Sequence, residues 1–566
     1  MNVNEKQKMS TIGEYNKPKR ILIIGGVAGG ATAAARVRRL DEAAEITILE
    51  KGKYVSFANC GLPYFISRDI QRRSNLLLQT PEGFYSRYRV EVKTNTEAIE
   101  IKRSEKIVVA RTSGGNQEIH YDKLLLAQGG SPVVPALPGV AKNHVFKLWT
   151  IPDMDSIHAY IEENKPAHAF IAGGGFIGLE MAEALSARGL KVTIVEAAPQ
   201  VMISMDAEFG AMIKSGLEDH GIQIKTHVGL SEIKNNSVLL SDGTELDADM
   251  VLLSIGTRPE LALAKASGLK IGENGGLVVD ETMRTNDPDI YAAGDMIEVV
   301  NKIHGRKVRI PLAGPANRQG RIAATNMLGG NMLYHGALGT SVVKLFDFTA
   351  ASTGLSERVA REAGFDVGVS YVFKDHHVAY YPGSKPLALK LIYDKKTTRL
   401  LGGQAYGQAG VEKRIDVLAT ALHGRMTLED LSELDLAYAP PYNGANDPIN
   451  LAAFIGLNHI TEFSPLKTPF ETLNELKNSE NIILDVRTMG EQSKAPLQGV
   501  LHIPADEIRD RLYEIPKEKT IFLLSKDGFL GHTTLQILKA NGWTRVYNIA
   551  GGYLAARWID GWNFNT

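Results

Sequence analysis

The sequence predicts an α/β protein of several domains, in which two parallel-sheet units follow one another along the chain. Each unit begins with a short apolar run that leads into a glycine-rich turn, at 20–30 and at 168–178. Short apolar runs of this kind are typical of strands buried in a parallel sheet. In each unit a second apolar run ends in a glutamate, Glu50 or Glu196. With 566 residues the chain is too long for one core, which favours about three to five domains.

Composition excludes several classes of protein. The formal net charge is -1, so no basic surface points to nucleic acid or to an anionic membrane. No apolar run approaches the roughly 20 residues that span a bilayer, and residues 1–17 are polar, unlike a secretory signal. Cys60 is the only cysteine, which excludes a disulfide scaffold and is typical of a reducing compartment. We therefore expect a cytoplasmic protein with a flexible extension at 1–17 and no metal site.

The first glycine turn, Gly25-Gly26-Val27-Ala28-Gly29-Gly30, opens a helix predicted over 31–40. Such a turn lets backbone N–H groups and the helix N-terminus meet the pyrophosphate of a dinucleotide. Val27 replaces the second glycine of G-x-G-x-x-G, so the motif is weak by itself, and a turn without a ligand is the alternative. Glu50, 20 residues after Gly30, strengthens the interpretation as an acceptor for ribose hydroxyls.

The second glycine turn, Gly173-Gly174-Gly175-Phe176-Ile177-Gly178, follows a strand predicted over 168–172 and completes the motif. Glu196 stands 18 residues after Gly178. Its charge would repel a 2′-phosphate, and the residues at 197–200 include no arginine to bind one, which favours NADH over NADPH. The sequence therefore predicts two Rossmann-like dinucleotide-binding domains. Their usual pairing is FAD with a nicotinamide nucleotide.

Two further strand ends complete the predicted nucleotide sites. A strand and glycine turn at 121–132 close the first half, and the segment 285–295 returns to it with Asp295 after an Ala-Ala-Gly sequence. Asp295 could accept hydrogen bonds from the sugar-alcohol arm of a flavin. The candidate cofactor-binding residues are Gly25, Val27, Ala28, Gly30, Glu50, Gly129 and Asp295 in the first unit, and Gly173, Gly175, Gly178 and Glu196 in the second.

Cys60 lies between the two halves of the first nucleotide site. A lone thiol cannot form an intramolecular disulfide, so a redox role requires a small thiol from outside or an oxygen atom as partner. The alternative is a small buried apolar residue, the usual fate of a free cysteine. We expect a helix at Cys60, and its N-terminus would help the thiol to ionise.

The order of these motifs, from about Arg20 to Phe463, resembles the flavin-dependent pyridine nucleotide-disulfide oxidoreductases. The Ser-Phe-Ala-Asn-Cys-Gly-Leu-Pro-Tyr sequence at 56–64 resembles their single-cysteine branch, which includes coenzyme A disulfide reductases, NADH-dependent persulfide reductases, and NADH oxidases and peroxidases. The resemblance implies that NAD(P)H reduces coenzyme A disulfide or persulfide through FAD and a mixed disulfide of Cys60 with coenzyme A. The alternative is an NADH oxidase or peroxidase in which Cys60 cycles through sulfenic acid.

The resemblance also implies site residues and a homodimer. Residues 340–462 resemble an α+β dimerisation domain, from which Tyr380 and Tyr438 would reach the partner subunit's active site and act beside Cys60 in catalysis. The implied coenzyme A contacts are Thr32, Arg36, Arg39, Ser56, Asn59 and Asn317.

The residues after Phe463 resemble an α/β rhodanese-like domain, with its signatures at 482–487, 502–504 and 551–553. In active rhodaneses a cysteine heads a loop of backbone N–H groups that holds persulfide sulfur. Ser525 takes the cysteine position here and Leu530 the position of the usual basic residue. Serine cannot carry sulfane sulfur, so we expect no sulfurtransferase activity. A partner-binding module is the alternative role.

Five segments result from these predictions. They are the extension at 1–17, an FAD-binding domain at 18–138 and 268–339, an NAD(P)H-binding domain at 139–267, the dimerisation domain at 340–462 and the rhodanese-like domain at 463–566.

Overall fold

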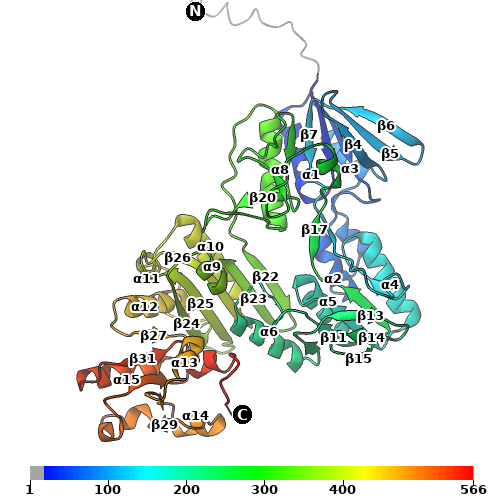
Figure 1. Cartoon of the computed structure of the whole chain (residues 1–566). Coiled ribbons are helices and arrows are strands. Elements are labelled where there is room, and N and C mark those ends of the chain that lie inside the picture. The colour runs from blue at the N-terminus through cyan, green and yellow to red at the C-terminus, as the bar shows by residue number, and fades with distance from the viewer. Residues whose placement is uncertain (1–17, 565–566) are drawn as a thin grey trace, which may run out of the picture.

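The computed structural model describes residues 18–564, so the extension expected at 1–17 lies outside the described residues. Four five-stranded sheets succeed one another along the chain, and smaller sheets connect or cover them (Figure 1). Among the residues described, no helix is long and apolar enough to cross a membrane.

The first large sheet is parallel and is built from two distant parts of the chain. Its strand order is β19 (Ile290–Ala292), β7 (Lys123–Leu126), β1 (Arg20–Ile24), β2 (Glu45–Leu49) and β3 (Val90–Lys93). β1 and β7 consist almost wholly of buried aliphatic side chains, as a strand covered on both faces requires. Helices α1 (Ala28–Leu40), α3 (Pro81–Tyr88) and α8 (Ala313–Met327) belong to this unit. α1 begins three residues earlier than the sequence predicts, with Val27 as its N-cap.

The second large sheet repeats this construction. Its parallel order is β12 (Gln223–Lys225), β11 (Lys191–Val195), β10 (His168–Ala172), β16 (Met250–Leu253) and β9 (Val145–Phe146). The helices of this unit are α4 (Ile151–Asn164), α5 (Phe176–Ala187) and α6 (Ala207–Asp219). β10 has the bounds that the sequence predicts for this strand.

Each nucleotide unit also carries a three-stranded antiparallel sheet. These are β4 (Glu97–Lys102), β5 (Ile107–Thr112) and β6 (Gly115–His120) in the first, and β13 (Leu230–Ile233), β14 (Ser237–Leu240) and β15 (Glu245–Asp247) in the second. The short pair β8 (Gly130–Pro132) and β17 (Thr257–Pro259) joins the two units. The first unit is completed by α7 (Ala262–Ala266), β18 (Leu277–Val278), β20 (Ile297–Val300) and β21 (Lys307–Val308).

The third large sheet is antiparallel, with the order β22 (Ser341–Leu345), β23 (Phe348–Gly354), β26 (Leu400–Gly407), β25 (Pro386–Asp394) and β24 (Val367–Asp375). Its helices are α9 (Glu357–Glu362), α10 (Val411–Gly424), α11 (Leu428–Ser432) and α12 (Pro448–Ile460). α10 packs on β23 and β26, and α12 packs on β24 and β25.

The fourth large sheet is parallel and lies beside the β24 edge of the third (Figure 1). Its order is β27 (Leu466–Lys467), β31 (Val546–Ile549), β30 (Thr520–Leu524), β28 (Asn481–Asp485) and β29 (Leu501–His502). The helices of this unit are α13 (Pro469–Glu475), α14 (Met489–Lys494), α15 (Phe529–Ala540) and α16 (Gly552–Ala556). Ala550 and Ala555 join the same apolar core as Tyr371 of β24, so the C-terminal unit is packed against the third sheet.

A buried charge cluster joins the second unit to the third sheet. Lys390 of β25 is fully buried, and its Nζ lies 2.9 Å from Asp206, 2.6 Å from Glu208 and 2.9 Å from Glu357. Burial lowers the pKa of Lys390, but the surrounding carboxylates outweigh burial and raise it well above its usual value. Lys390 therefore stays protonated, and its ion pairs tie the start of α6 to the third sheet.

Candidate functional site

The first glycine turn forms a cradle at the end of β1. Gly25 has φ +98°, and a Cβ added there would lie 2.3 Å from the carbonyl oxygen of Ala127. A Cβ on Gly30 would lie 1.9 Å from the carbonyl oxygen of Gly25, so only glycine lets α1 start this close to the strand. The carboxylate of Glu50 accepts N–H bonds from Gly26 at 2.9 Å and Gly52 at 2.8 Å. Each of its oxygens keeps a second lone pair for a ribose hydroxyl.

The second glycine turn repeats this geometry at the end of β10. Gly173 has φ +106°, and a Cβ on Gly178 would lie 2.0 Å from the carbonyl oxygen of Gly173. Glu196 accepts N–H bonds from Gly174 and Ala198, both at 2.8 Å. The two glycine turns therefore form equivalent cradles, and each cradle fits a dinucleotide. The glutamates, expected as ribose acceptors, are held in place by the turns themselves.

Asp295 lies at the carboxyl end of β19, beside the first cradle. Its carboxyl group is mostly buried, and burial raises its pKa. Gly294, with φ +87°, donates its N–H to Gln319 of α8 at 2.8 Å. Gly129 also has a positive φ, +66°, in the turn between β7 and β8. The structure thus brings Asp295 and Gly129 to the strand ends that the sequence predicts.

Cys60 is exposed and lies in a single 3₁₀ turn, Asn59–Gly61, with its Sγ 3.6 Å from the Asn59 Oδ1. The helical segment expected at Cys60 is present: the 3₁₀ turn that contains Cys60 leads directly into α2 (Leu62–Ile66), which begins two residues later. Ser56, with φ +46°, donates its N–H to Gly26 at 2.8 Å. This bond ties the cysteine segment to the first cradle.

The residues around Cys60 oppose its ionisation. Protein atoms packed around the sulfur raise the pKa of the Cys60 thiol, and the charges of Glu180 and Asp295 raise it further, while the backbone N–H of Cys60 lowers it. The effects that raise the pKa outweigh the help from the backbone at the start of this helical segment. The same charges show that Cys60 lies near Asp295 of the first unit and near Glu180 of the second.

Glu180 is a site residue that the sequence reasoning missed. It lies on α5, just after the second cradle, and burial raises its pKa to about 7. Tyr64 of α2 donates its hydroxyl to Glu180 at 3.4 Å, and burial and the charge of Glu180 raise the pKa of Tyr64 to about 12. The available signal was an acid near the start of an apolar helix, two residues after Gly178. Its relation to Cys60 depends on contacts between distant segments.

The predicted coenzyme A contacts on α1 face α8, which packs beside it (Figure 1). Thr32 Oγ1 donates to Asn317 Oδ1 at 3.0 Å, and Arg36 Nε donates to Thr325 Oγ1 at 3.2 Å. Arg321 lies midway between Asn317 and Thr325, and therefore on the same face of α8. Sequence reasoning missed Arg321.

Three arginines, Arg36, Arg39 and Arg321, place positive charge where α1 and α8 meet. The pKa of Arg36 is lowered by burial and by the charges of Arg321 and Arg39. In the region 18–564, no carboxylate lies within 4.0 Å of any of the three guanidinium groups. Like charges without an acidic partner are suited to phosphate groups.

Tyr380 and Tyr438 approach one another on exposed loops of the third unit. Tyr380 follows β24 and Tyr438 follows α11, and their hydroxyl oxygens are 3.3 Å apart. The exposed fractions are 74% and 49%, so both side chains are free to meet another surface. The hydrogen bond with Tyr438 raises the pKa of Tyr380.

The loop after β30 is closed around Ser525. Ser525 is fully buried, and its Oγ accepts the N–H of Gly528 at 2.9 Å. Asn548 donates to the Gly528 carbonyl at 2.9 Å from behind the loop. Phe529, the first residue of α15 after the loop, is 69% exposed. The hydroxyl at the predicted nucleophile position therefore stabilises the loop instead of facing solvent.

Comparison with known proteins identifies the fold. The family described as pyridine nucleotide-disulphide oxidoreductase matches residues 19–320, more than half of the chain. The chain belongs to this family. The family's dimerisation domain matches residues 340–447, and the rhodanese-like domain matches residues 469–557.

Two relatives align with most of this chain. A coenzyme A disulfide reductase of Staphylococcus haemolyticus (strain JCSC1435) is 35% identical over 439 residues, which are 77% of this chain and 99% of the relative. An NAD(P)H sulfur oxidoreductase (CoA-dependent) of Pyrococcus abyssi (strain GE5 / Orsay) is 37% identical over 438 residues, 77% of this chain and 97% of the relative.

Solved structures extend the similarity to the C-terminal unit. Reduced Bacillus anthracis CoADR-RHD is 40% identical with a TM-score of 0.93, covering 96% of this chain and 98% of that one. A water-forming NADH oxidase from Lactobacillus brevis is 26% identical with a TM-score of 0.75, covering 79% of this chain and 99% of the oxidase. The family uses FAD and NAD(P)H, and both glycine cradles fit these nucleotides. The lower identity and coverage do not favour the oxidase alternative.

Proposed function

We propose that this protein is an FAD-dependent reductase that uses NAD(P)H to reduce coenzyme A disulfide or coenzyme A persulfide through Cys60. One observation carries the proposal: an exposed lone cysteine lies between two nucleotide cradles and near residues of both. The relatives named as reductases of coenzyme A disulfide or sulfur support the choice of substrate.

The proposed first step is attack by Cys60. Its thiolate attacks one sulfur of coenzyme A disulfide, a bond forms between the Cys60 Sγ and that sulfur, and a coenzyme A thiolate leaves. With coenzyme A persulfide the leaving group is hydrosulfide, and the same mixed disulfide results. When bound, FAD supplies the transfer of two electrons from NAD(P)H to a disulfide. Reduction of the mixed disulfide returns the Cys60 thiolate and releases the coenzyme A that was bound to Cys60 as its thiol.

Glu180 is proposed to adjust the charge beside Cys60. Its pKa of about 7 places it between protonated and charged states near neutrality. When Glu180 is protonated, the negative charge that opposes the Cys60 thiolate is removed. Tyr64 bonds to Glu180 from the helix after Cys60, so it positions Glu180 relative to the thiol.

The helix pair α1 and α8 is proposed to bind the substrate's phosphates. Arg36, Arg39 and Arg321 supply the charge, and the Thr32–Asn317 hydrogen bond sets how the two helices meet. Ser56 and Asn59 lie on the cysteine segment and are proposed to contact the pantetheine arm. This arrangement leads the substrate from the arginines to Cys60.

A homodimer is proposed to complete the site, since the dimerisation domain of the family is present. Tyr380 and Tyr438 are proposed to serve the partner subunit, where a tyrosine hydroxyl protonates the leaving thiolate. Their exposure and their mutual hydrogen bond support this role. We propose the domain division predicted from the sequence, with the rhodanese-like domain at 463–566 inactive as a sulfurtransferase.

An anaerobic assay of NADH consumption tests the proposal. We expect turnover with coenzyme A disulfide or coenzyme A persulfide and a higher kcat/KM with NADH than with NADPH, since Glu196 disfavours a 2′-phosphate. Turnover with oxygen or hydrogen peroxide alone would instead support an oxidase or peroxidase.

A further inference from the structure

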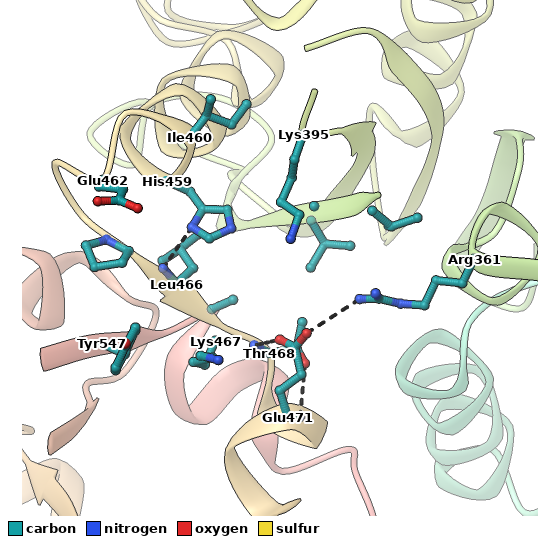
Figure 2. A pocket seen from close by; sticks show the side chains of 15 residues that line it. Arg361, Lys395, His459, Ile460, Glu462, Leu466, Lys467, Thr468, Glu471 and Tyr547 are labelled. Carbon is teal, nitrogen blue, oxygen red and sulfur yellow. Dashed lines mark hydrogen bonds and ion pairs between the residues drawn. The ribbon is translucent and has the colours of Figure 1, made fainter. Parts of the chain in front are cut away.

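A cavity of about 320 Å³ separates the third unit from the C-terminal unit, far along the chain from Cys60 (Figure 2). α9, β24 and α12 line one side, and β27, α13 and β31 line the other. Its volume is at the lower end of the range for small-ligand sites. None of its lining residues belongs to the proposed reductase site.

Three hydrogen-bond donors converge on one side of the cavity: Arg361, Lys395 and His459 (Figure 2). Arg361 donates through Nε and Nη2 to Glu357, and these bonds leave its Nη1 hydrogens available. Lys395 pairs with Asp366 at 2.9 Å, and an ammonium group has two further hydrogens. The side chains of Arg361 and Lys395 are 43% and 38% exposed, so a ligand can reach both.

His459 acts as a donor towards the cavity. Its Nδ1 accepts the backbone N–H of Leu466 at 3.0 Å, so in the neutral ring the hydrogen is carried by Nε2. Burial and the charge of Lys395 lower the pKa of His459, while Glu471 and Asp366 oppose that shift. The neutral ring therefore presents an Nε2–H beside two cations.

The opposite wall provides acceptors and an aromatic ring. Glu471 accepts the N–H of Thr468 at 2.9 Å and lies 3.7 Å from Arg361, with its carboxylate towards the cavity (Figure 2). Tyr547 lies below, with the Lys467 Nζ 5.2 Å from its ring centre. A ligand here meets the donors Lys395 and His459, and next to them Arg361 with the Glu471 carboxylate 3.7 Å from it.

We propose that this cavity binds a small phosphate ester that carries hydroxyl groups, and that the ligand bridges the dimerisation and rhodanese-like domains. The phosphate would accept hydrogen bonds from Arg361, Lys395 and His459. The hydroxyl groups would donate to Glu471, whose charge is offset by Arg361 at 3.7 Å. The cavity is larger than a lone phosphate requires, which favours the ester over the free anion.

Isothermal titration of the FAD-loaded enzyme with ribose 5-phosphate tests the proposal, with ribose and inorganic phosphate as partial probes. We expect one ribose 5-phosphate to bind per chain, more tightly than either partial probe. Lys395→Met should weaken binding by about tenfold or more, because a charge-assisted hydrogen bond is lost. Lys395→Arg should retain binding. Lys396→Met is the matched control, because Lys396 is exposed and does not line the cavity.

Three outcomes would overturn the inference. If ribose 5-phosphate does not bind at millimolar concentration, the proposed site does not exist. Binding that survives Lys395→Met but is lost in Arg36→Ala would place the ligand at the arginine cluster of α1 and α8. Inorganic phosphate binding as tightly as the ester would reject the ester. Turnover of coenzyme A disulfide is measured in parallel, and the proposed function fails only if that turnover is absent from the unaltered enzyme.

Discussion

Cys60, in the 3₁₀ turn that precedes α2, and Ser525, at the carboxyl end of β30, have side chains in opposite surroundings. Cys60 is exposed in an Asn59–Gly61 turn, near acids from two units of the chain. Ser525 is fully buried, and its hydroxyl accepts a hydrogen bond from the N–H of Gly528. The Cys60 thiol can therefore reach a substrate, whereas the Ser525 hydroxyl accepts a hydrogen bond within its own loop.

From this difference we infer that the sulfur chemistry of the chain takes place in the reductase part. A rhodanese-like fold matches at 469–557, but the match alone does not supply a nucleophile. The same fold can serve as a structural partner for the dimerisation domain, and the shared core at Ala550 and Ala555 fits that role. The following predictions test the contrast.

The largest effect is expected from Cys60→Ser. Turnover with coenzyme A disulfide should fall by on the order of 10³-fold or more, because a serine hydroxyl is not ionised near neutrality and forms no disulfide. Steady-state NADH consumption measures the loss. Ser525→Ala is the control and should retain turnover within about twofold. A large loss from Ser525→Ala would break the contrast between the two loops.

A smaller effect is expected from Arg36→Ala. Removing this charge should raise the KM for coenzyme A disulfide by about tenfold or more with little change in kcat, because a phosphate contact is made equally before and during reaction. Added salt should also raise the KM of the unaltered enzyme for coenzyme A disulfide, because salt screens the arginine charge. Arg358→Ala, at an exposed ion pair with Glu362, is the matched control. A fall in kcat with constant KM would contradict the assignment.

Glu180→Gln should shift the titration of Cys60. The carboxylate becomes charged above pH about 7 and raises the pKa of the thiol, so a neutral side chain should lower that pKa. The rate of alkylation by iodoacetamide, measured against pH on the reduced protein, should then rise at lower pH. Glu218→Gln is the control, because Glu218 pairs with Lys214 on α6 and its charge does not affect the pKa of Glu180, Tyr64 or Cys60. An unchanged pH profile would separate Glu180 from Cys60.

The smallest effect is expected from Ser525→Cys. This substitution should leave thiosulfate:cyanide sulfurtransferase activity near background, because the position is buried and Leu530 supplies no charge to the loop. Adding Leu530→Arg tests whether charge is the missing feature. Strong activity from Ser525→Cys alone would show that the loop already supports the chemistry.

The sequence predicts the nucleotide cradles well because their geometry is local. Gly25, Gly30 and Glu50 act within one short unit of β1, α1 and β2, and the structure brings them together as expected. The helical segment expected at Cys60 is also local, but its form is not predicted: it starts as a 3₁₀ turn at Asn59–Gly61 and becomes α-helical only from Leu62 to Ile66.

Glu180 and Arg321 could not be found in this way, because their roles depend on segments far apart in the chain. Glu180 meets Tyr64 across 116 residues, and Thr32 on the helix facing Arg321 meets Asn317 across 285 residues. No periodicity or motif encodes which helices pack together. The burial of Ser525 likewise depends on the closed fold of its loop.

The intact mass of the protein tests the central claim most directly. The reduced, FAD-loaded protein is incubated with coenzyme A disulfide in the absence of NADH, and its mass is measured before and after a thiol reductant. We predict a gain of one coenzyme A per chain that the reductant removes and that Cys60→Ser abolishes. No gain, or an added oxygen atom on Cys60 in its place, would contradict a mixed disulfide with coenzyme A.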